Sequence, residues 1–256
     1  MNIFGETQVN LSKDIILNFL NIENYSNELF ELIEKEIGYI RNGDLSTDEL
    51  RYVKLKIKNW LAGKKDMRAK IGFVSEFICH LYLRHNKFEQ YSLFKNLEEK
   101  GPKKGFDALY VFDDRMWIVE SKSTSDLKKT HCNKIQEAYK DLKNKIEKTT
   151  GGEKENDPWE NAKNHLDNRN IKENLSLCKS VKKLSEDFVD KIEHKIDEFN
   201  VITCSTIYLN SQWKLIDNDE LEKLLSELLK AYTAKKIQVI CVNKKCIDDF
   251  IKFIES

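Results

Sequence analysis

The sequence is poor in residues that interrupt regular structure, because its 256 residues include only 2 prolines and 9 glycines. This scarcity excludes a collagen-like chain and a disordered chain rich in proline and glycine. The length allows a sizeable hydrophobic core in one large domain, or in a core domain with an extension. No apolar run approaches the roughly 18 residues that a membrane span needs. The first residues, MNIFGETQVN, do not resemble a secretory signal, so we expect a cytoplasmic protein.

Cysteine and histidine are present, but not in the spacings typical of zinc sites. No CxxC pair occurs among the six cysteines, and the five histidines form neither HxxxH nor HExxH. We therefore expect neither a zinc site nor a disulfide framework. Most of the cysteines lie in apolar segments such as SEFICHLYL, which predicts buried, reduced thiols.

An excess charge of one sign is also absent, since 43 Lys and Arg residues balance 43 Asp and Glu residues. The two signs are nevertheless segregated along the chain. Residues 1–50 carry 3 basic and 10 acidic side chains, whereas residues 51–105 carry 14 basic and 5 acidic ones. This pattern is compatible with solvated faces, with acidic and basic segments packed on each other, or with an acidic segment beside a polyanion-binding face.

Apolar spacing predicts helices over 26–40 and 47–61, and we interpret residues 1–62 as an N-terminal helical extension. Residues 63–256 are expected to form the core domain. Its predicted elements are a helix at 66–86, a short strand within 90–97, strands at 105–112 and 116–123, a helix at 125–148, one or two helices up to 194, a strand at 200–209, a helix at 217–233, a strand at 236–242 and a helix at 246–255. This order predicts an α/β fold with a mixed sheet flanked by helices.

Two of these strands are predicted to form a hairpin around a turn at Asp113-Asp114. With a two-residue turn, the numbers of paired residues sum to 227, so Asp107 faces Glu120. Lys122 shares a face with Glu120, because side chains two residues apart on a strand point the same way. The three side chains are therefore expected to converge. A three-residue turn would shift the register and separate them.

Opposed carboxylates on an apolar hairpin repel each other, and a buried charge without a partner is costly. A hard divalent cation with oxygen ligands would compensate for Asp107 and Glu120, and the ammonium of Lys122 could hold a water or a phosphate oxygen. The alternative is an ordinary ion pair between Glu120 and Lys122 at a strand end. The opposed aspartate and the order of elements favour the metal site.

The steps Gly105-Phe106-Asp107 and Glu120-Ser121-Lys122 resemble the signature of the PD-(D/E)xK nuclease superfamily, which has the restriction-endonuclease-like fold. The resemblance implies that Asp107 and Glu120 bind Mg²⁺, for which Mn²⁺ can substitute, and that Lys122 is the catalytic lysine. It also implies a further catalytic and metal-binding role for Glu76 on the preceding helix, which could instead be a surface residue. Phe106 replaces the usual proline. The Gln-xxx-Tyr step of RecB-like members is not matched, because Gln136 and Tyr139 are one residue too close.

A narrower resemblance, over about residues 66–168, is to the HamA family, the nuclease subunits of the Hachiman anti-phage defence system. The segments GFVSEF, KGFDALYVF, WIVESKST and PWENAKNH carry it. It implies a helicase partner similar to HamB and the degradation of DNA during phage attack.

These features predict a Mg²⁺-dependent nuclease that hydrolyses phosphodiester bonds, with DNA as the expected substrate. The alternative is a catalytically silent module of the same fold that binds nucleic acid or a partner protein. Contacts with the nucleic-acid backbone are expected from basic residues on both sides of the hairpin. These are Lys58, Lys64, Lys65, Arg68, Lys70, Lys128 and Lys129.

Two further side chains allow two interpretations each. Trp159 could stack on a base, or it could anchor the polar loop that precedes it to the core. His131, in the helix after the hairpin, could approach phosphate or could be a solvated helix residue.

Overall fold

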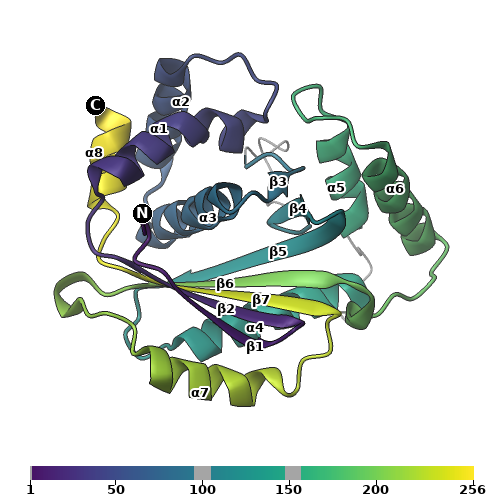
Figure 1. The fold of residues 1–256 in the computed structure, drawn as a ribbon. Helices are drawn as coiled ribbons and strands as arrows, with labels where there is room; N and C mark the ends of the chain where they lie inside the picture. Colours follow the sequence, from purple (N-terminus) through teal and green to yellow (C-terminus); the bar gives the residue numbers. More distant parts are fainter. Residues whose placement is uncertain (1, 95–104, 148–156) are drawn as a thin grey trace.

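The computed structural model describes residues 2–94, 105–147 and 157–256. Its centre is a seven-stranded mixed sheet with helices on both faces (Figure 1). The strand order is β1-β2-β7-β6-β5-β4-β3, in which β2, β7, β6 and β5 run parallel and the other pairs are antiparallel. The prediction of an α/β fold with a mixed sheet flanked by helices is confirmed.

The elements have the following bounds. The strands are β1 (Thr7–Ser12), β2 (Ile15–Ile22), β3 (Glu89–Gln90), β4 (Ala108–Phe112), β5 (Arg115–Thr124), β6 (Asn200–Tyr208) and β7 (Lys236–Lys244). The α-helices are α1 (Asn27–Asn42), α2 (Leu50–Gly63), α3 (Met67–His85), α4 (His131–Glu147), α5 (Pro158–Leu166), α6 (Leu175–Val189), α7 (Asn218–Leu229) and α8 (Asp248–Glu255). None of the helices in the described ranges combines the length and the apolar character needed to cross a bilayer.

The prediction that residues 1–62 are a helical extension is wrong for residues 7–22. These residues form β1 and β2, and β2 pairs in parallel with β7 inside the main sheet. The local pattern explains the strands, because Val9 and Leu11 alternate with polar residues and IILNFLNI is a short apolar run. The two predicted helices, α1 and α2, are present.

The predicted hairpin register is confirmed from Ala108↔Val119 to Phe112↔Arg115. Asp113 and Asp114 form the two-residue turn with φ angles of 51° and 55°. Positive φ at both central residues is typical of a type I′ turn, whose twist matches that of the flanking strands. Aspartate tolerates this left-handed conformation better than most residues do.

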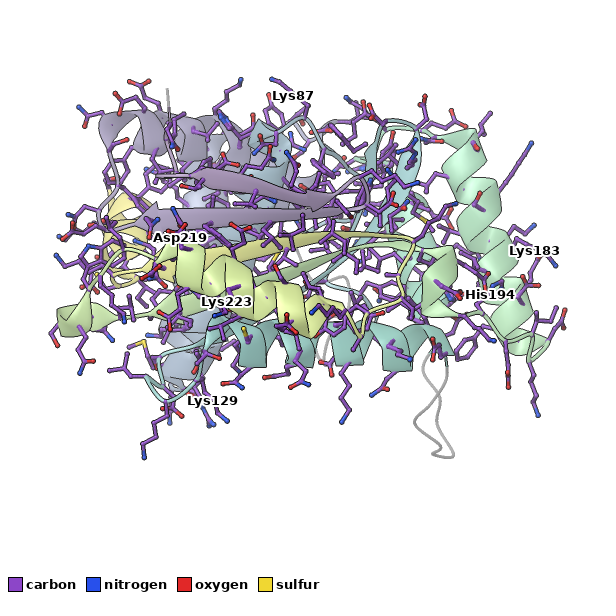
Figure 2. All side chains as sticks on the ribbon, turned by 60° about the horizontal axis from the view of Figure 1, so that its bottom comes forward. Lys87, Lys129, Lys183, His194, Asp219 and Lys223 are labelled. Carbon is purple, nitrogen blue, oxygen red and sulfur yellow. The ribbon has the colours of Figure 1, made fainter. Side chains whose placement is uncertain are left out.

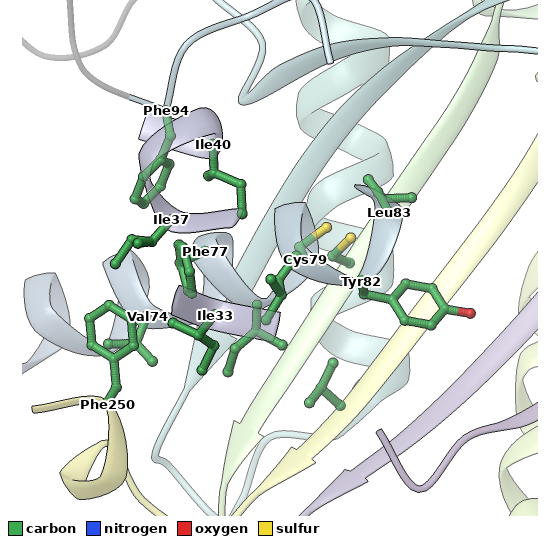
Figure 3. Packing of buried hydrophobic residues seen from close by; sticks show 14 of the residues in the cluster. Ile33, Ile37, Ile40, Val74, Phe77, Cys79, Tyr82, Leu83, Phe94 and Phe250 are labelled. Carbon is green, nitrogen blue, oxygen red and sulfur yellow. The ribbon is translucent and has the colours of Figure 1, made fainter. Parts of the chain in front are cut away.

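The sheet divides the core into two apolar clusters. On one face, Trp117 and Val119 of β5 belong to the cluster that contains α3, α1 and α8. Figure 3 shows its centre, where Phe77 of α3 lies among side chains of α1 and α8. Ile118 belongs to the cluster on the other face, which contains α4, α5 and α7. Because side chains alternate along a strand, Glu120 and Lys122 lie on the α4 side.

Helix α4 begins at His131, six residues later than the start predicted from Ser125-Asp126. The carboxylate of Asp126 accepts a hydrogen bond from the amide of Lys128, and this bond stabilises a turn before the helix instead of capping the helix start. The hydroxyl of Thr130 instead accepts from the amide of Asn133, as a residue at a helix start does. The predicted short strand within 90–97 is also displaced, because β3 consists of Glu89–Gln90 and residues 95–97 lie outside the described ranges.

The segregated charges are partly paired with each other. Arg84 near the end of α3 forms ion pairs with Glu36 of α1 at 2.7 Å and with Asp44 at 2.8 Å. All three side chains are largely buried. Acidic residues of the first 50 positions thus pack against Arg84, and two exposed pairs, Arg51 with Glu49 and Lys56 with Asp48, also join the two segments.

Candidate active site

The hairpin brings Asp107 to the centre of the Glu120-Ser121-Lys122 step. Regular pairing ends at Ala108↔Val119, and the amide of Asp107 donates to the carbonyl of Val119 at 3.1 Å. The Asp107 carboxylate then accepts from the amide of Ser121 at 2.7 Å. Asp107 therefore contacts the residue next to Glu120. The prediction that the two carboxylates face each other directly is therefore corrected: the amide of Asp107 bonds to Val119, and its carboxylate bonds to the amide of Ser121. This backbone N–H stabilises the charge of Asp107.

Glu120 is only 2 % exposed, and both of its carboxylate oxygens are paired with ammonium groups. The Nζ atom of Lys122 lies 3.0 Å from Oε1, as the shared face of β5 predicts. The Nζ atom of Lys145, from α4, lies 2.6 Å from Oε2. Lys122 forms a second ion pair with Asp141 of α4. We call these four residues, Glu120, Lys122, Asp141 and Lys145, the Glu120 cluster.

The charges of this cluster fix the protonation of Lys122. Burial acts to lower the pKa of Lys122, but the charge of Glu120 and hydrogen bonds to Asp141 and Glu120 outweigh it and raise the pKa above its ordinary value. Lys122 is therefore an ammonium at every physiological pH. It can donate hydrogen bonds and stabilise negative charge, but it cannot act as a general base.

The sequence did not single out the contributions of α4. These contributions are Asp141 and Lys145. Their four-residue spacing indicates that they share one side of a helix. The apolar residues next to them, Leu142 and Ile146, indicate that this side of α4 faces the sheet, and both are buried.

Glu76 belongs to the other helix layer. It lies on α3, and its carboxylate is 3.8 Å from Nε2 of His80. The Nδ1 atom of His80 is hydrogen-bonded to the hydroxyl of Tyr110 on the α3 side of the sheet. The Glu120 cluster is built from β5 and α4, so Glu76 is not one of its members.

The donor types nevertheless fit Mg²⁺. In the part of the chain that the structure describes, no three Asp, Glu, His or Cys side chains are grouped to hold a metal ion. Mg²⁺ does not require such a group, since it is usually bound by one or two carboxylates, with water and substrate phosphate as further ligands. Two carboxylates belong to this part of the hairpin, those of Glu120 and of Asp107, which accepts from the amide of the residue after Glu120. An ion that binds Glu120 competes with two ammonium groups for the carboxylate oxygens.

The basic residues predicted to contact nucleic acid lie in two places. Lys58, Lys64, Lys65, Arg68 and Lys70 lie on α2, the α2–α3 junction and the start of α3, and all but Lys64 and Lys70 are well exposed. Lys128 and Lys129 are exposed in the turn between β5 and α4, where Figure 2 shows Lys129 projecting from the protein. Arg68 forms an ion pair with Asp66 at 3.0 Å, so it is partly neutralised.

Three other residues have structural roles. Trp159 is 1 % exposed and packs on the rings of Phe106 and Phe199, so it is a core residue and the prediction of base stacking is wrong. Most of the loop that it was predicted to anchor lies outside the described residues. His131 is buried between the hydroxyl of Ser205 and the amide oxygen of Asn243. Burial lowers its pKa to about 4, so His131 is neutral, and both interpretations of it were wrong.

Tyr139 likewise serves the fold. Its hydroxyl accepts from the amide of Thr233 at 2.9 Å, and its ring stacks on that of Tyr232. Gln136 is exposed on the same helix. Neither residue belongs to the Glu120 cluster, in agreement with the missing Gln-xxx-Tyr spacing.

Comparison with known proteins gives one positive result. The HamA family model matches residues 12–256, from the end of β1 through the last helix. The match contains Asp107, Glu76 and the whole Glu120 cluster. No curated protein matches the sequence. The chain therefore belongs to the HamA family, which indicates a role in Hachiman anti-phage defence.

Proposed function

We propose that this protein is a metal-dependent nuclease of the PD-(D/E)xK type that cleaves DNA in anti-phage defence, together with a HamB-like helicase. One observation carries the proposal. Asp107 contacts the central residue of Glu120-Ser121-Lys122, so an aspartate, a buried glutamate and a charged lysine meet at one hairpin. A mixed sheet with helices on both faces is compatible with that superfamily.

The chemistry is divided between the two carboxylates and the lysine. Asp107 and Glu120 would hold Mg²⁺ or Mn²⁺, whereas Glu76, next to His80 in the α3 layer, takes no part in this site. The ion would lower the pKa of a bound water and neutralise charge on the phosphate. Lys122, an ammonium held by Asp141, would orient the attacking water and stabilise negative charge in the transition state. The amide of Ser121 keeps the Asp107 carboxylate in place.

The surface of α2 supports binding of a polyanion. Helix α2 and the two residues after it, 50–65, contain six basic side chains and no acidic one. Tyr52 and Trp60 are 46 % and 39 % exposed on this surface. Basic groups that follow a phosphate backbone, with aromatic rings between them, are typical of surfaces that bind nucleic acid without sequence preference.

One observation favours a second function, that of a catalytically silent module that binds nucleic acid or a partner. Both oxygens of Glu120 are already paired with lysines, so the cluster is balanced without a metal ion. In that case the Glu120 cluster would be a structural ion-pair network, and its removal would affect stability alone.

Cleavage assays separate the two functions. The purified chain, alone and with its helicase partner, is incubated with supercoiled, linear and single-stranded DNA and with RNA, in Mg²⁺, Mn²⁺ or EDTA. We expect DNA cleavage that requires metal, and a loss of roughly 100-fold or more in Glu120→Ala and Lys122→Ala, because groups that stabilise transition-state charge have effects of that size.

Glu137→Ala and Lys143→Ala are the matched controls on α4, because both side chains are exposed and form ion pairs outside the cluster. Circular dichroism and thermal melting show that each variant is folded. Full activity of a folded Glu120→Ala or Lys122→Ala protein would contradict the catalytic assignment. Absence of metal-dependent cleavage under every condition would favour the silent module.

A further inference from the structure

Lys145 holds a position that is unusual for a surface lysine. It extends from α4 to the buried carboxylate of Glu120, where Nζ lies 2.6 Å from Oε2. The Lys145 side chain is 28 % exposed, whereas that of Glu120 is 3 % exposed. One end of the Lys145 side chain is therefore close to solvent, while its charge neutralises a group that solvent hardly reaches.

The charge balance shows why Lys145 is needed when no metal is bound. A buried carboxylate is stable only if its charge is compensated. Lys122 compensates for part of it, but its ammonium is shared with Asp141. Lys145 supplies the second positive charge, so the cluster contains two carboxylates and two ammonium groups. A divalent cation added to this balanced cluster would give it an excess of positive charge.

Of the two lysines, Lys145 is the one that can leave. Lys122 has described ion pairs with Glu120 and Asp141, and its side chain is the less exposed, at 21 %. The described ion pair of Lys145 is with Glu120 alone. Its four-carbon stem is flexible, so a change of rotamer can move the ammonium toward solvent without moving α4.

We propose that Lys145 is the resident counter-ion of Glu120 in the metal-free protein and that a divalent metal ion must displace it. This inference rests on the proposed function, because it concerns how the same site acquires its metal. The contact with Lys145 weakens metal binding and restrains the nuclease. A phosphate backbone near the site attracts the displaced ammonium, so nucleic acid and metal each favour binding of the other.

The test measures metal binding without substrate. Mn²⁺ is titrated into wild type, Lys145→Met and Lys143→Met, and the free ion is followed by electron paramagnetic resonance. Lys143 is the matched control, since it lies on the same helix but pairs with Glu147 at 3.8 Å. We expect Lys145→Met to bind Mn²⁺ on the order of tenfold more tightly than wild type, as loss of a competing charged hydrogen bond implies. Lys143→Met should bind like wild type.

Two further variants make the result decisive. Asp107→Asn in the Lys145→Met background should abolish the tight binding, which places the ion at the hairpin. Lys145→Gln, which keeps a neutral donor beside Glu120, replaces the methionine variant if that variant is poorly folded, and it should also bind Mn²⁺ more tightly than wild type.

The outcomes distinguish the inference from the function on which it rests. Equal Mn²⁺ affinity in wild type and both Lys145 variants, lost on Asp107→Asn, would overturn the role of Lys145 and leave the nuclease site intact. Weaker binding in the Lys145 variants would also overturn it. If no variant binds Mn²⁺, the metal site of the proposed function is wrong, and the inference falls with it.

Discussion

Glu120 and Lys244 are two buried charged residues on opposite faces of one sheet. Glu120 is 2 % exposed on the α4 side and has two ammonium partners. Lys244, the last residue of β7, is 0 % exposed, and its Nζ atom has no hydrogen-bond partner among the described residues. That atom lies 4.3 Å from the centre of the Tyr25 ring, in the cluster on the α3 side.

The two sites show different ways to keep a charge inside a protein. At Glu120, opposite charges compensate for the loss of solvent. At Lys244, a cation–π contact and the more distant Asp249 compensate incompletely, and burial lowers the pKa from 10.5 to about 8. The first charge is therefore fixed by its partners, whereas the second is held only weakly near neutral pH. Removing the ammonium partners of Glu120 should therefore lower the free energy of unfolding, whereas removing the charge of Lys244 should raise it.

The largest effect is expected from removing both partners of Glu120. Either Lys122→Met or Lys145→Met leaves one ammonium beside the carboxylate. The double variant leaves a buried charge with no compensation, which costs about 3–5 kcal/mol of unfolding free energy. The loss should exceed the sum of the single losses, because each lysine replaces the other in part. Urea denaturation in EDTA measures all three variants. Adding Glu120→Gln should recover much of the loss, and simple additivity would contradict the shared role.

At Lys244 we expect the opposite sign. Lys244→Met should stabilise the protein by about 1–2 kcal/mol at pH 7, because an apolar side chain replaces a poorly compensated buried charge. The lowered pKa means that the unfolded chain binds more protons than the folded one between pH 8 and 10.5, so wild-type stability from this group rises across that window. The gain in the variant should therefore be largest below pH 8 and shrink above it.

Urea denaturation at pH 7 and pH 9.5 tests both parts of this prediction. The control is Lys245→Met, because Lys245 is the adjacent residue but is 38 % exposed and pairs with Glu23. It should change stability little at either pH. A destabilised Lys244→Met protein would mean that the contact with Tyr25 contributes more than burial of the charge costs.

The smallest effect is expected at Asp141, the most exposed member of the Glu120 cluster. Its side chain is 39 % exposed, so its ion pair with Lys122 is screened by solvent. Asp141→Asn should cost less than about 1 kcal/mol and should be sensitive to salt. Thermal melting at low and high ionic strength measures this. A loss as large as that of the double lysine variant would show that Asp141 is as strongly coupled as Glu120.

Much of the fold could be predicted from local pattern. The alternation around Asp113-Asp114 fixed the hairpin register, and the apolar runs of β6 and β7 identified buried strands. The position of Asp107 could be predicted only approximately, because the last step of the hairpin departs from regular pairing. At this step the Asp107 side chain accepts a hydrogen bond from the Ser121 amide, and a periodic pattern does not encode such a contact.

The rest of the site depends on tertiary packing. Whether Lys145 or another lysine of α4 meets Glu120 is set by the rotation of the helix on the sheet, and its start at His131 differs from the predicted one. The sequence predicts the helix that carries Glu76, but it does not predict that this helix covers the face of the sheet opposite to α4. The local pattern of residues 7–22 is typical of strands, but the place of β2 in the sheet depends on β7, at the other end of the chain.

That pairing has a consequence for how the chain is made. The side-chain amide of Asn18 donates to the carbonyl of Val239, 221 residues later, and β2 lies against β7 along its whole length. A contact between such distant segments forms slowly, because the intervening loop must close first. During synthesis, β2 leaves the ribosome long before β7 exists. Leu17 and Phe19 are fully buried in the folded protein, so they stay accessible to solvent until β7 has been synthesised. The first strands of the chain are therefore among the last to be buried.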